Sequence, residues 1–309
     1  MTELKIGVIG GTGMGQALAG TEGTRHEMET PFGRPSDAIV ETNWANVPIF
    51  ILSRHGPGHL INPSQINSRA NLFALKELGC THILASGAVG SLREEFKPKD
   101  LVIPDQVIDK THKRANTFYD NAAVHVEFAE PFCPLLRQIL LEAGKSAGDF
   151  SVHDRGCYVC MEGPAFSTRA ESLMHRLWGG DLIGMTAMPE AKLAKEAEMS
   201  YGLIALVTDY DCWRNKPAAI SGKAPENAPA AEATSPGHEL LKEIIGNLQS
   251  ATQCAVVLIK RAVELMSQRQ EQLAQAPAQR ALEMAIWSDK GRIDRQEVQR
   301  LRRLWMKYL

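Results

Sequence analysis

The stretch Leu203-Ile204-Ala205-Leu206-Val207-Thr208-Asp209-Tyr210-Asp211-Cys212-Trp213 joins an apolar run to a pair of acids. The run predicts a buried strand, and side chains two apart on a strand share a face, so Asp209 and Asp211 should leave its carboxyl end side by side. Ligands bind at that edge of open α/β sheets, and paired carboxylates push each other's pKa values apart. The pair indicates acid chemistry or recognition of a polar heterocycle. The alternative is a helix cap beside a solvated acid.

The rest of the chain predicts one α/β domain with a mixed sheet. Asp37–Val40 and Val47–Leu52, joined by Glu41–Asn46, are typical of an antiparallel hairpin. Elsewhere strand-like and helix-like runs alternate, which favours a largely buried sheet flanked by helices. The strand-like runs are 5–9, 47–52, 81–85, 101–103, 157–161 and 202–208, and the clearest helix-like runs are 65–78, 134–147 and 166–178.

Bulk composition excludes several classes of partner. The 309 residues include 34 basic and 36 acidic ones, and a net charge of −2 provides no field that would attract nucleic acid. The N-terminus predicts a strand rather than a targeting segment, and no run approaches a membrane span, so we expect a soluble, cytoplasmic protein. Cys157 and Cys160 form a CxxC with His153 nearby, but a second ligand pair is missing; strand packing is expected, and no metal.

The C-terminal third predicts a loop followed by helices. Residues 214–237 are rich in Ala and Pro, and a mobile cover over the site and a surface insertion without a role are both open interpretations. A helix is expected from about His238 to Met266. The tail 267–309 has helical periodicity and a basic stripe, and we expect it to dock on its own core or on a neighbouring subunit. Contact with an anionic partner is the less favoured alternative.

Two turns after predicted strands suit an anion. Gly10-Gly11-Thr12-Gly13 offers backbone N–H groups and a hydroxyl, and Gln16 occupies the third glycine position of a dinucleotide motif, which argues against a nicotinamide cofactor. Ser53-Arg54-His55-Gly56-Pro57-Gly58-His59 adds a guanidinium, whose fork fits a tetrahedral oxyanion, and His55 as a second donor. Arg-His pairs also form salt bridges, but two such turns on one sheet favour a phosphate site.

Three further segments could complete a pocket. Ala85–Leu92 predicts a turn of small residues with free amides, though an ordinary glycine loop would look the same. Glu162–Glu171 places Phe166 and Ser167 at the start of a helix, with a core position as the alternative for Phe166. Met185-Thr186-Ala187-Met188-Pro189-Glu190 supplies a thioether and a hydroxyl, although methionine is often core filler.

With these motifs together, the chain from about Lys5 to Trp213 resembles the trimeric purine nucleoside phosphorylases, and among them the methylthioadenosine phosphorylases. The motifs that carry the resemblance are Gly-Gly-Thr-Gly at 10–13, Thr-Pro-Phe-Gly-Arg-Pro-Ser-Asp at 30–37, Arg-His-Gly at 54–56, Gly-Ser-Leu-Arg-Glu-Glu at 90–95, Ala-Glu-Pro-Phe-Cys-Pro at 129–134, Glu-Gly-Pro at 162–164 and Thr-Asp-Tyr-Asp-Cys-Trp at 208–213. The resemblance implies the nucleoside phosphorylase fold, a partly barrel-like mixed sheet in one domain (1–266), with 267–309 as a helical extension. It also implies a homotrimer or a dimer of trimers.

The family's site residues can be placed by matching positions. Phosphate binding falls to Thr12, Arg54, His55, Gly87, Ala88 and Thr186; substrate binding to Phe166, Ser167, Met185, Asp209, Tyr210, Asp211, His125 and His238; and catalysis to Asp209, Asp211 and His55. Met185 then lies along the ribose, Phe166 packs on the base, and a protonated Asp209 donates to N7 of the purine. His125 matches a histidine that reaches into the neighbouring subunit's site. The family's chemistry uses inorganic phosphate as co-substrate and needs no metal or organic cofactor.

Two departures leave the substrate open. Gly87 stands where the methylthioadenosine enzymes carry threonine, so one phosphate donor is missing. His238 resembles the histidine with which other purine nucleoside phosphorylases bind a 5′-hydroxyl. The favoured reaction is phosphorolysis of S-methyl-5′-thioadenosine, because a carboxylic acid at Asp209 matches a 6-aminopurine. The alternatives are a broader enzyme acting on adenosine, inosine or guanosine, and a catalytically idle purine-binding relative.

Overall fold

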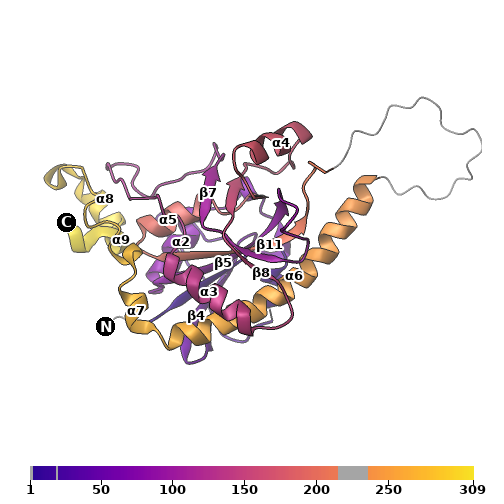
Figure 1. Ribbon diagram of the computed structural model, residues 1–309. Helices are drawn as coiled ribbons and strands as arrows, with labels where there is room; N and C mark the ends of the chain where they lie inside the picture. The colour runs from indigo at the N-terminus through magenta and orange to yellow at the C-terminus, as the bar shows by residue number, and fades with distance from the viewer. Residues whose placement is uncertain (1–2, 19, 215–235) are drawn as a thin grey trace, which may run out of the picture.

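The computed structural model describes residues 3–18, 20–214 and 236–309, apart from the side chains of 16, 236–241 and 243. Eleven strands form one mixed sheet, which helices flank (Figure 1). The strands are β1 (Ile6–Gly10), β2 (Thr24–His26), β3 (Ile39–Trp44), β4 (Val47–Ser53), β5 (His82–Ser91), β6 (Leu101–Ile103), β7 (Gln106–Asp109), β8 (Val152–Asp154), β9 (Cys157–Cys160), β10 (Leu182–Gly184) and β11 (Ser200–Asp209). The helices are α1 (Met14–Leu18), α2 (Ser68–Glu77), α3 (Pro134–Ser146), α4 (Arg169–Leu177), α5 (Glu190–Glu196), α6 (Pro236–Ser267), α7 (Gln270–Ala274), α8 (Arg295–Arg300) and α9 (Arg302–Trp305).

The sheet branches at β5. Its main path runs β2-β3-β4-β1-β5-β10-β9-β7, while β11 pairs with β5 and β6, and β6 with β8. Strand β1 is parallel to both β4 and β5, and β11 is parallel to β5, whereas β3 and β4 form the expected antiparallel hairpin. The predicted mixed α/β sheet is therefore confirmed.

The small-residue segment after Ala85 is strand, not the turn that the sequence predicted. Strand β5 continues to Ser91 because β11 pairs with it as far as Gly90. On the opposite edge, β1 pairs only with His82–Ala85 and β10 only with Gly90–Ser91. Residues 86–89 thus carry no strand partner on the β1 edge among the described strands, and this gap is where the pocket described below opens.

Among the element boundaries that differ from the sequence-based expectation, two have clear local reasons. The hairpin strand β3 extends to Trp44, and the turn contracts to Ala45 and Asn46, whose φ values of 50° and 61° suit a two-residue type I′ turn. Helix α4 begins at Arg169 rather than Phe166, because Thr168 and Glu171 form a capping box. Phe166 and Ser167 are left in the coil before the helix.

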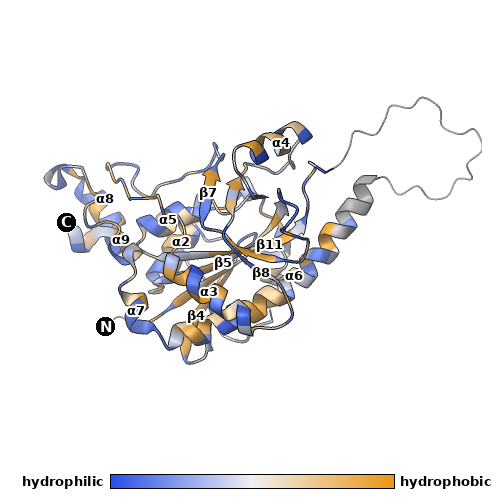
Figure 2. Cartoon of the chain, in the orientation of Figure 1, coloured by the Kyte–Doolittle hydropathy of each residue, from blue (hydrophilic) through white to orange (hydrophobic). Residues whose placement is uncertain are grey.

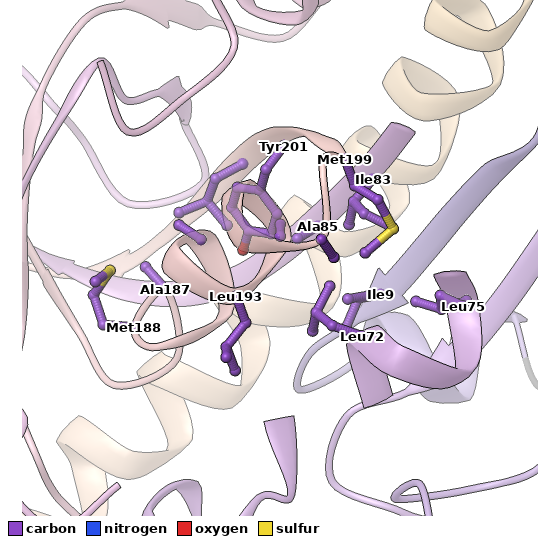
Figure 3. Packing of buried hydrophobic residues seen from close by; sticks show 14 of the residues in the cluster. Ile9, Leu72, Leu75, Ile83, Ala85, Ala187, Met188, Leu193, Met199 and Tyr201 are labelled. Carbon is purple, nitrogen blue, oxygen red and sulfur yellow. The ribbon is translucent and has the colours of Figure 1, made fainter. Parts of the chain in front are cut away.

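The core lies between the sheet and its helices. Ile9 and Ala85 of neighbouring strands pack with Leu72 and Leu75 of α2 and with Tyr201 of β11 (Figure 3). The central strands are mostly hydrophobic, as the colouring of Figure 2 shows, and β1 is buried along its whole length. Within the described residues, none of the helices combines the length and apolar character that crossing a bilayer requires.

The C-terminal tail docks on the chain's own core, one of the two expected arrangements. Leu282, Leu301, Leu304 and Trp305 are buried in the same cluster as the central strands. Trp305 lies 4.9 Å from Tyr119, measured between ring centroids. The predicted helix from about 238 to 266 is α6, whereas the predicted loop falls almost entirely on 215–235, outside the described residues.

Candidate active site

A cavity of about 300 Å³ opens where β1, β4, β5, β10 and β11 end or lose their partners. It brings together predicted residues from six separate segments of the sequence. Those that line it are Thr12, Arg54, His55, Gly87, Ala88, Phe166, Ser167, Met185, Thr186, Asp209 and Asp211. A larger cavity of about 890 Å³ lies beside it and shares the lining residues Gly11, Thr12, His55, His59 and Leu248.

The backbone of the glycine turn at Gly10 and Gly11 lies directly against the residue that follows β4, Arg54. The backbone N–H of Arg54 donates to Gly10 O at 2.9 Å. A Cβ on Gly11 would lie 2.7 Å from Ser86 O and 2.8 Å from Nη1 of Arg54, so only glycine fits between them. The close approach of these backbones places the hydroxyl of Thr12 and the guanidinium of Arg54 in one pocket.

Arg54 is held by the carboxylate of Glu190, for which no role was predicted. Its Nε and Nη2 donate to Oε2 and Oε1 of Glu190 at 2.9 and 2.8 Å, and Nη1 donates to Ser86 O at 2.7 Å. Both side chains are 1% exposed. Burial lowers the pKa of Arg54, but the charge and hydrogen bonds of Glu190 raise it above its ordinary value. The guanidinium is therefore already fixed in place, and its charge is partly balanced by Glu190, before a ligand binds.

His55 presents an acceptor rather than the expected donor. Its Nδ1 lies 2.8 Å from Ile61 O, and a carbonyl can only accept, so the proton is on Nδ1. Burial, opposed by that hydrogen bond and reinforced by the charge of Arg54, lowers the pKa of His55 to about 4. The ring is neutral at pH 7, and Nε2 can accept a hydrogen bond from a protonated phosphate oxygen.

The acids lie at the other end of the cavity, and a turn rather than strand alternation holds them together. Asp209 ends β11, while Asp211 has a φ of 49°. The N–H of Asp211 donates to Oδ1 of Asp209 at 2.7 Å, and the Thr208 hydroxyl donates to Oδ2 at 2.7 Å. Burial, together with the charge of Asp209, raises the pKa of Asp211 above its ordinary value. The surroundings of Asp211 thus favour its protonated form.

Strand β5 sets the spacing between the two ends. A Cβ on Gly87 would lie 3.0 Å from the Thr186 hydroxyl, whereas a Cβ on Gly90 would lie 3.2 Å from Oδ1 of Asp209. These two glycines are three residues apart, which corresponds to roughly 10 Å along a strand. The cavity thus has an anion-suited end and an acidic end with room for a sugar between them.

The remaining wall of the cavity is formed mainly by the apolar side chains of Phe166 and Met185. Phe166 is 69% exposed at the cavity, so it is not a core residue. Met185 lies over Gly163, since a Cβ there would lie 2.5 Å from its sulfur. Ser167 O accepts from the Cys212 thiol at 3.3 Å, which ties the Phe166 segment to the acid turn. An aromatic face and a thioether suit a heterocycle and a sugar.

Two predicted residues, Tyr210 and His125, do not line this cavity. The Tyr210 hydroxyl donates to Glu94 O at 3.5 Å and its ring packs under Arg214, because the turn at Asp211 points the side chain outward. His125 lies beside Trp287 of the tail, with ring centroids 4.7 Å apart. The side chain of His238 lies outside the described residues. The described residues also hold no cluster of three metal-ligating side chains.

Sequence reasoning missed Glu190 and Arg114. Glu190 stands in the quoted stretch 185–190, and the signal was present in principle, because a buried arginine requires an acid. Arg114 carries no motif that single-sequence reasoning could use. Four of its five hydrogen bonds run to main-chain carbonyls, which no side-chain pattern reveals.

Comparisons with known proteins identify the family of this chain. A sequence model of the phosphorylase superfamily matches residues 5–245. The chain belongs to the phosphorylase superfamily. It is 41% identical over 311 residues to the S-methyl-5′-thioadenosine phosphorylase of Thermosynechococcus vestitus, covering 99% of each chain.

Solved structures of this superfamily share the fold. A methylthioadenosine phosphorylase from an Antarctic soil metagenomic library has a TM-score of 0.84 at 41% identity, covering 98% of this chain and 99% of the other. The methylthioadenosine phosphorylase of Schistosoma mansoni in complex with adenine has a TM-score of 0.79 at 35% identity, covering 92% and 99%. A variant of the same enzyme, described as an adenosine/methylthioadenosine phosphorylase, was solved with methylthioadenosine at 34% identity, with the same TM-score and coverage.

Proposed function

We propose that this chain catalyses phosphorolysis of S-methyl-5′-thioadenosine, giving adenine and 5-methylthioribose 1-phosphate. The observation that carries the proposal is the two-ended cavity, with Arg54, His55 and Thr186 at one end and Asp209 and Asp211 at the other. Relatives that span the full chain and carry this activity in their names support the choice of substrate.

The two ends match the charges that glycosidic cleavage develops. As the C–N bond breaks, positive charge grows on the sugar and negative charge on the departing base. Phosphate held at Thr12, Arg54 and Thr186 forms the new bond to C1′, and the acid pair gives a proton or hydrogen bond to the base. Burial raises the pKa of Asp211, and Asp209 lies beside it, so we assign the proton to the pair rather than to one member.

The remaining assignments follow from position. Met185 lies along the sugar, Phe166 packs on the purine, and the β5 edge at Gly87 and Ala88 contributes backbone N–H groups to phosphate. Neutral His55 accepts from a protonated oxygen of the phosphate. Inorganic phosphate is the co-substrate, and the protein groups used in the steps above belong to this chain.

We also propose that the chain acts as a homotrimer in the cytoplasm, with residues 1–266 as the catalytic domain and 267–309 as an integral extension. Exposed His125 supports this assembly, because it is available to complete the site of a neighbouring copy. Mixing inactive His125→Ala and Asp209→Asn proteins should restore activity if His125 acts across the interface. Mixed assemblies that stay inactive would place its role within one subunit.

The test of the reaction is phosphate-dependent release of adenine from methylthioadenosine, compared with release from adenosine and of hypoxanthine from inosine. Methylthioadenosine should be turned over fastest, and no base should be released without phosphate. Faster turnover of inosine would contradict the 6-aminopurine assignment. Adenine binding with no phosphorolysis of any of these nucleosides would identify an idle relative.

Adenosine is the second candidate substrate. The name of the Schistosoma mansoni enzyme includes both nucleosides, and this favours testing them side by side. A site that hydrogen-bonds a hydroxyl strongly rejects an analogue that lacks it. If His238 binds a 5′-hydroxyl, His238→Ala will depress turnover of adenosine far more than turnover of methylthioadenosine.

A further inference from the structure

Arg114 lies behind the cavity, in the segment between β7 and α3, and does not line it. Its side chain is only 6% exposed. A buried guanidinium must have its charge and its donors satisfied by the groups around it. The groups that satisfy Arg114 belong to two walls of the cavity, the segment 161–167 after β9 and the segment 185–188 after β10.

The guanidinium makes five hydrogen bonds, as many as it has N–H groups. Nη1 donates to the carbonyls of Met185 and Met188, at 2.6 and 2.7 Å. Nη2 donates to Glu162 O at 2.6 Å and to Met161 O at 3.4 Å, and Nε donates to Oε1 of Glu162 at 3.2 Å. One rigid, planar group thus holds both walls at once.

Arg114 takes over where strand pairing stops. Strands β9 and β10 are parallel neighbours, and at their carboxyl ends the N–H of Met161 donates to Gly184 O at 2.9 Å. Beyond that point the two segments are no longer paired as strands, and the guanidinium of Arg114 bridges their carbonyls. The Glu162 carboxylate also accepts from the N–H of His112 at 2.8 Å, which fixes the Arg114 segment itself.

The two walls carry different parts of the proposed site. The segment after β9 leads to Phe166 and Ser167 on the purine side, whereas Met185 and Thr186 serve sugar and phosphate. The walls also touch, because Met185 packs over Gly163, whose φ is 70°. A shift of one wall relative to the other therefore changes the spacing between base, sugar and phosphate contacts.

We propose that Arg114 is a positioning residue that keeps the purine wall and the phosphate wall in register. This inference rests on the proposed function for the identity of the ligands. Arg114 does not line the cavity and acts through the carbonyls and the Glu162 carboxylate that it holds. Loss of the guanidinium should weaken binding at both walls more than it slows chemistry in the bound complex.

The test compares Arg114→Met and Arg114→Lys with Arg137→Met. Arg137 is a matched control outside the cavity, since it also donates to a main-chain carbonyl, Pro104 O at 2.9 Å, and to a carboxylate, that of Asp154 at 2.5 Å. The measurements are adenine affinity by calorimetry, KM for nucleoside and for phosphate, kcat and melting temperature. Adenine affinity is informative even if the preferred nucleoside differs.

Arg114→Met should raise the adenine Kd and both KM values at least about tenfold, because small misplacements of binding groups have effects of this size. The fall in kcat should be smaller. Arg137→Met should lose a similar amount of thermal stability while keeping those constants within about twofold of the parent. Lysine is a single point charge that cannot bridge both walls, so Arg114→Lys should have Kd and KM values between those of the parent and those of Arg114→Met. The lysine variant replaces the methionine variant in the test if the latter does not fold.

The inference is overturned if a folded Arg114 variant keeps the parent's adenine Kd and both KM values, or if Arg137→Met changes them equally. Failure of the proposed function looks different, because the parent protein itself would then bind no adenine or release none from methylthioadenosine. Added guanidinium ion, which can occupy the vacated space, should partly restore adenine affinity to an Arg114→Ala protein but not to Arg137→Ala.

Discussion

Glu190 grips Arg54 through two parallel hydrogen bonds beneath the anion-suited end of the cavity, with Tyr201 donating its hydroxyl to the same carboxylate at 2.6 Å. All three side chains are almost fully buried. The arrangement fixes the guanidinium before any ligand arrives. The carboxylate of Glu190 also balances part of the positive charge of Arg54. The same ion pair therefore affects both the stability of the fold and the affinity for phosphate.

Glu190→Gln should make folding depend on phosphate. Removing one partner of a buried pair leaves an uncompensated charge and costs about 3–5 kcal/mol of the free energy of unfolding. A bound phosphate supplies a new partner for Arg54, so it should stabilise the variant more than the parent. Urea titrations with and without phosphate measure both effects. Equal stabilisation of the two proteins by phosphate would show that Arg54 does not contact it.

His55 should titrate far below an ordinary histidine in the free protein. Its pKa of about 4 is lowered chiefly by burial, and a bound phosphate dianion favours the imidazolium, so phosphate should raise it. His82, whose pKa burial also lowers to about 4, does not line the cavity and serves as the internal control. Proton NMR of the ring C–H signals reports each pKa. Equal shifts of both histidines would contradict a specific contact.

The same two histidines predict acid sensitivity with a definite sign. Between pH 6.5 and about 4, His55 and His82 bind protons in the unfolded chain but stay neutral in the folded chain. The free energy of unfolding therefore falls as pH falls. Each group contributes a slope of up to about 1.4 kcal/mol per pH unit in that window. His82→Gln should flatten the slope measured by urea titration. An unchanged slope would mean that His82 is protonated or solvated when folded.

Asp209→Asn should change which purine the site accepts. A protonated Asp209 can donate to a ring nitrogen and accept from a 6-amino group, whereas an amide offers an N–H donor to a 6-oxo group. We expect turnover of methylthioadenosine to fall about a hundredfold or more, and inosine to lose much less. Asp120→Asn, at an exposed ion pair with Arg69, is the matched control. A uniform loss across all nucleosides would assign Asp209 to chemistry alone.

Gly87→Thr should strengthen phosphate binding if the Thr186 side chain can move to make room for it. The new Cβ would lie 3.0 Å from the Thr186 hydroxyl, which must move by a few tenths of an ångström. A hydroxyl donating to a charged oxygen contributes about 1.5–3 kcal/mol, so KM for phosphate should drop about tenfold or more. Gly87→Ala adds the methyl group without the hydroxyl and should not lower KM. A rise in KM with both variants would mean that the contact is too tight to relax.

Strand and helix positions were largely readable from the sequence because they depend on local periodicity. The runs 47–52 and 202–208 became β4 and β11, and 134–147 became α3. The extension of β5 through Gly87 to Ser91 was missed, since small residues give no apolar pattern and only pairing with β11 keeps them extended. The start of α4 was misplaced because the capping box at Thr168 outweighs the apolar pattern before it.

The sequence by itself determined the ingredients of the site: a glycine turn, an arginine–histidine pair and two acids after buried strands, because strand ends and turn residues are local properties. Tertiary structure decided how those groups are used. Glu190 balances Arg54 across 136 residues of chain, burial keeps His55 neutral, and the turn at Asp211 sends Tyr210 outward. Desolvation and long-range pairing set charge and orientation, and neither is encoded in the spacing of neighbouring residues.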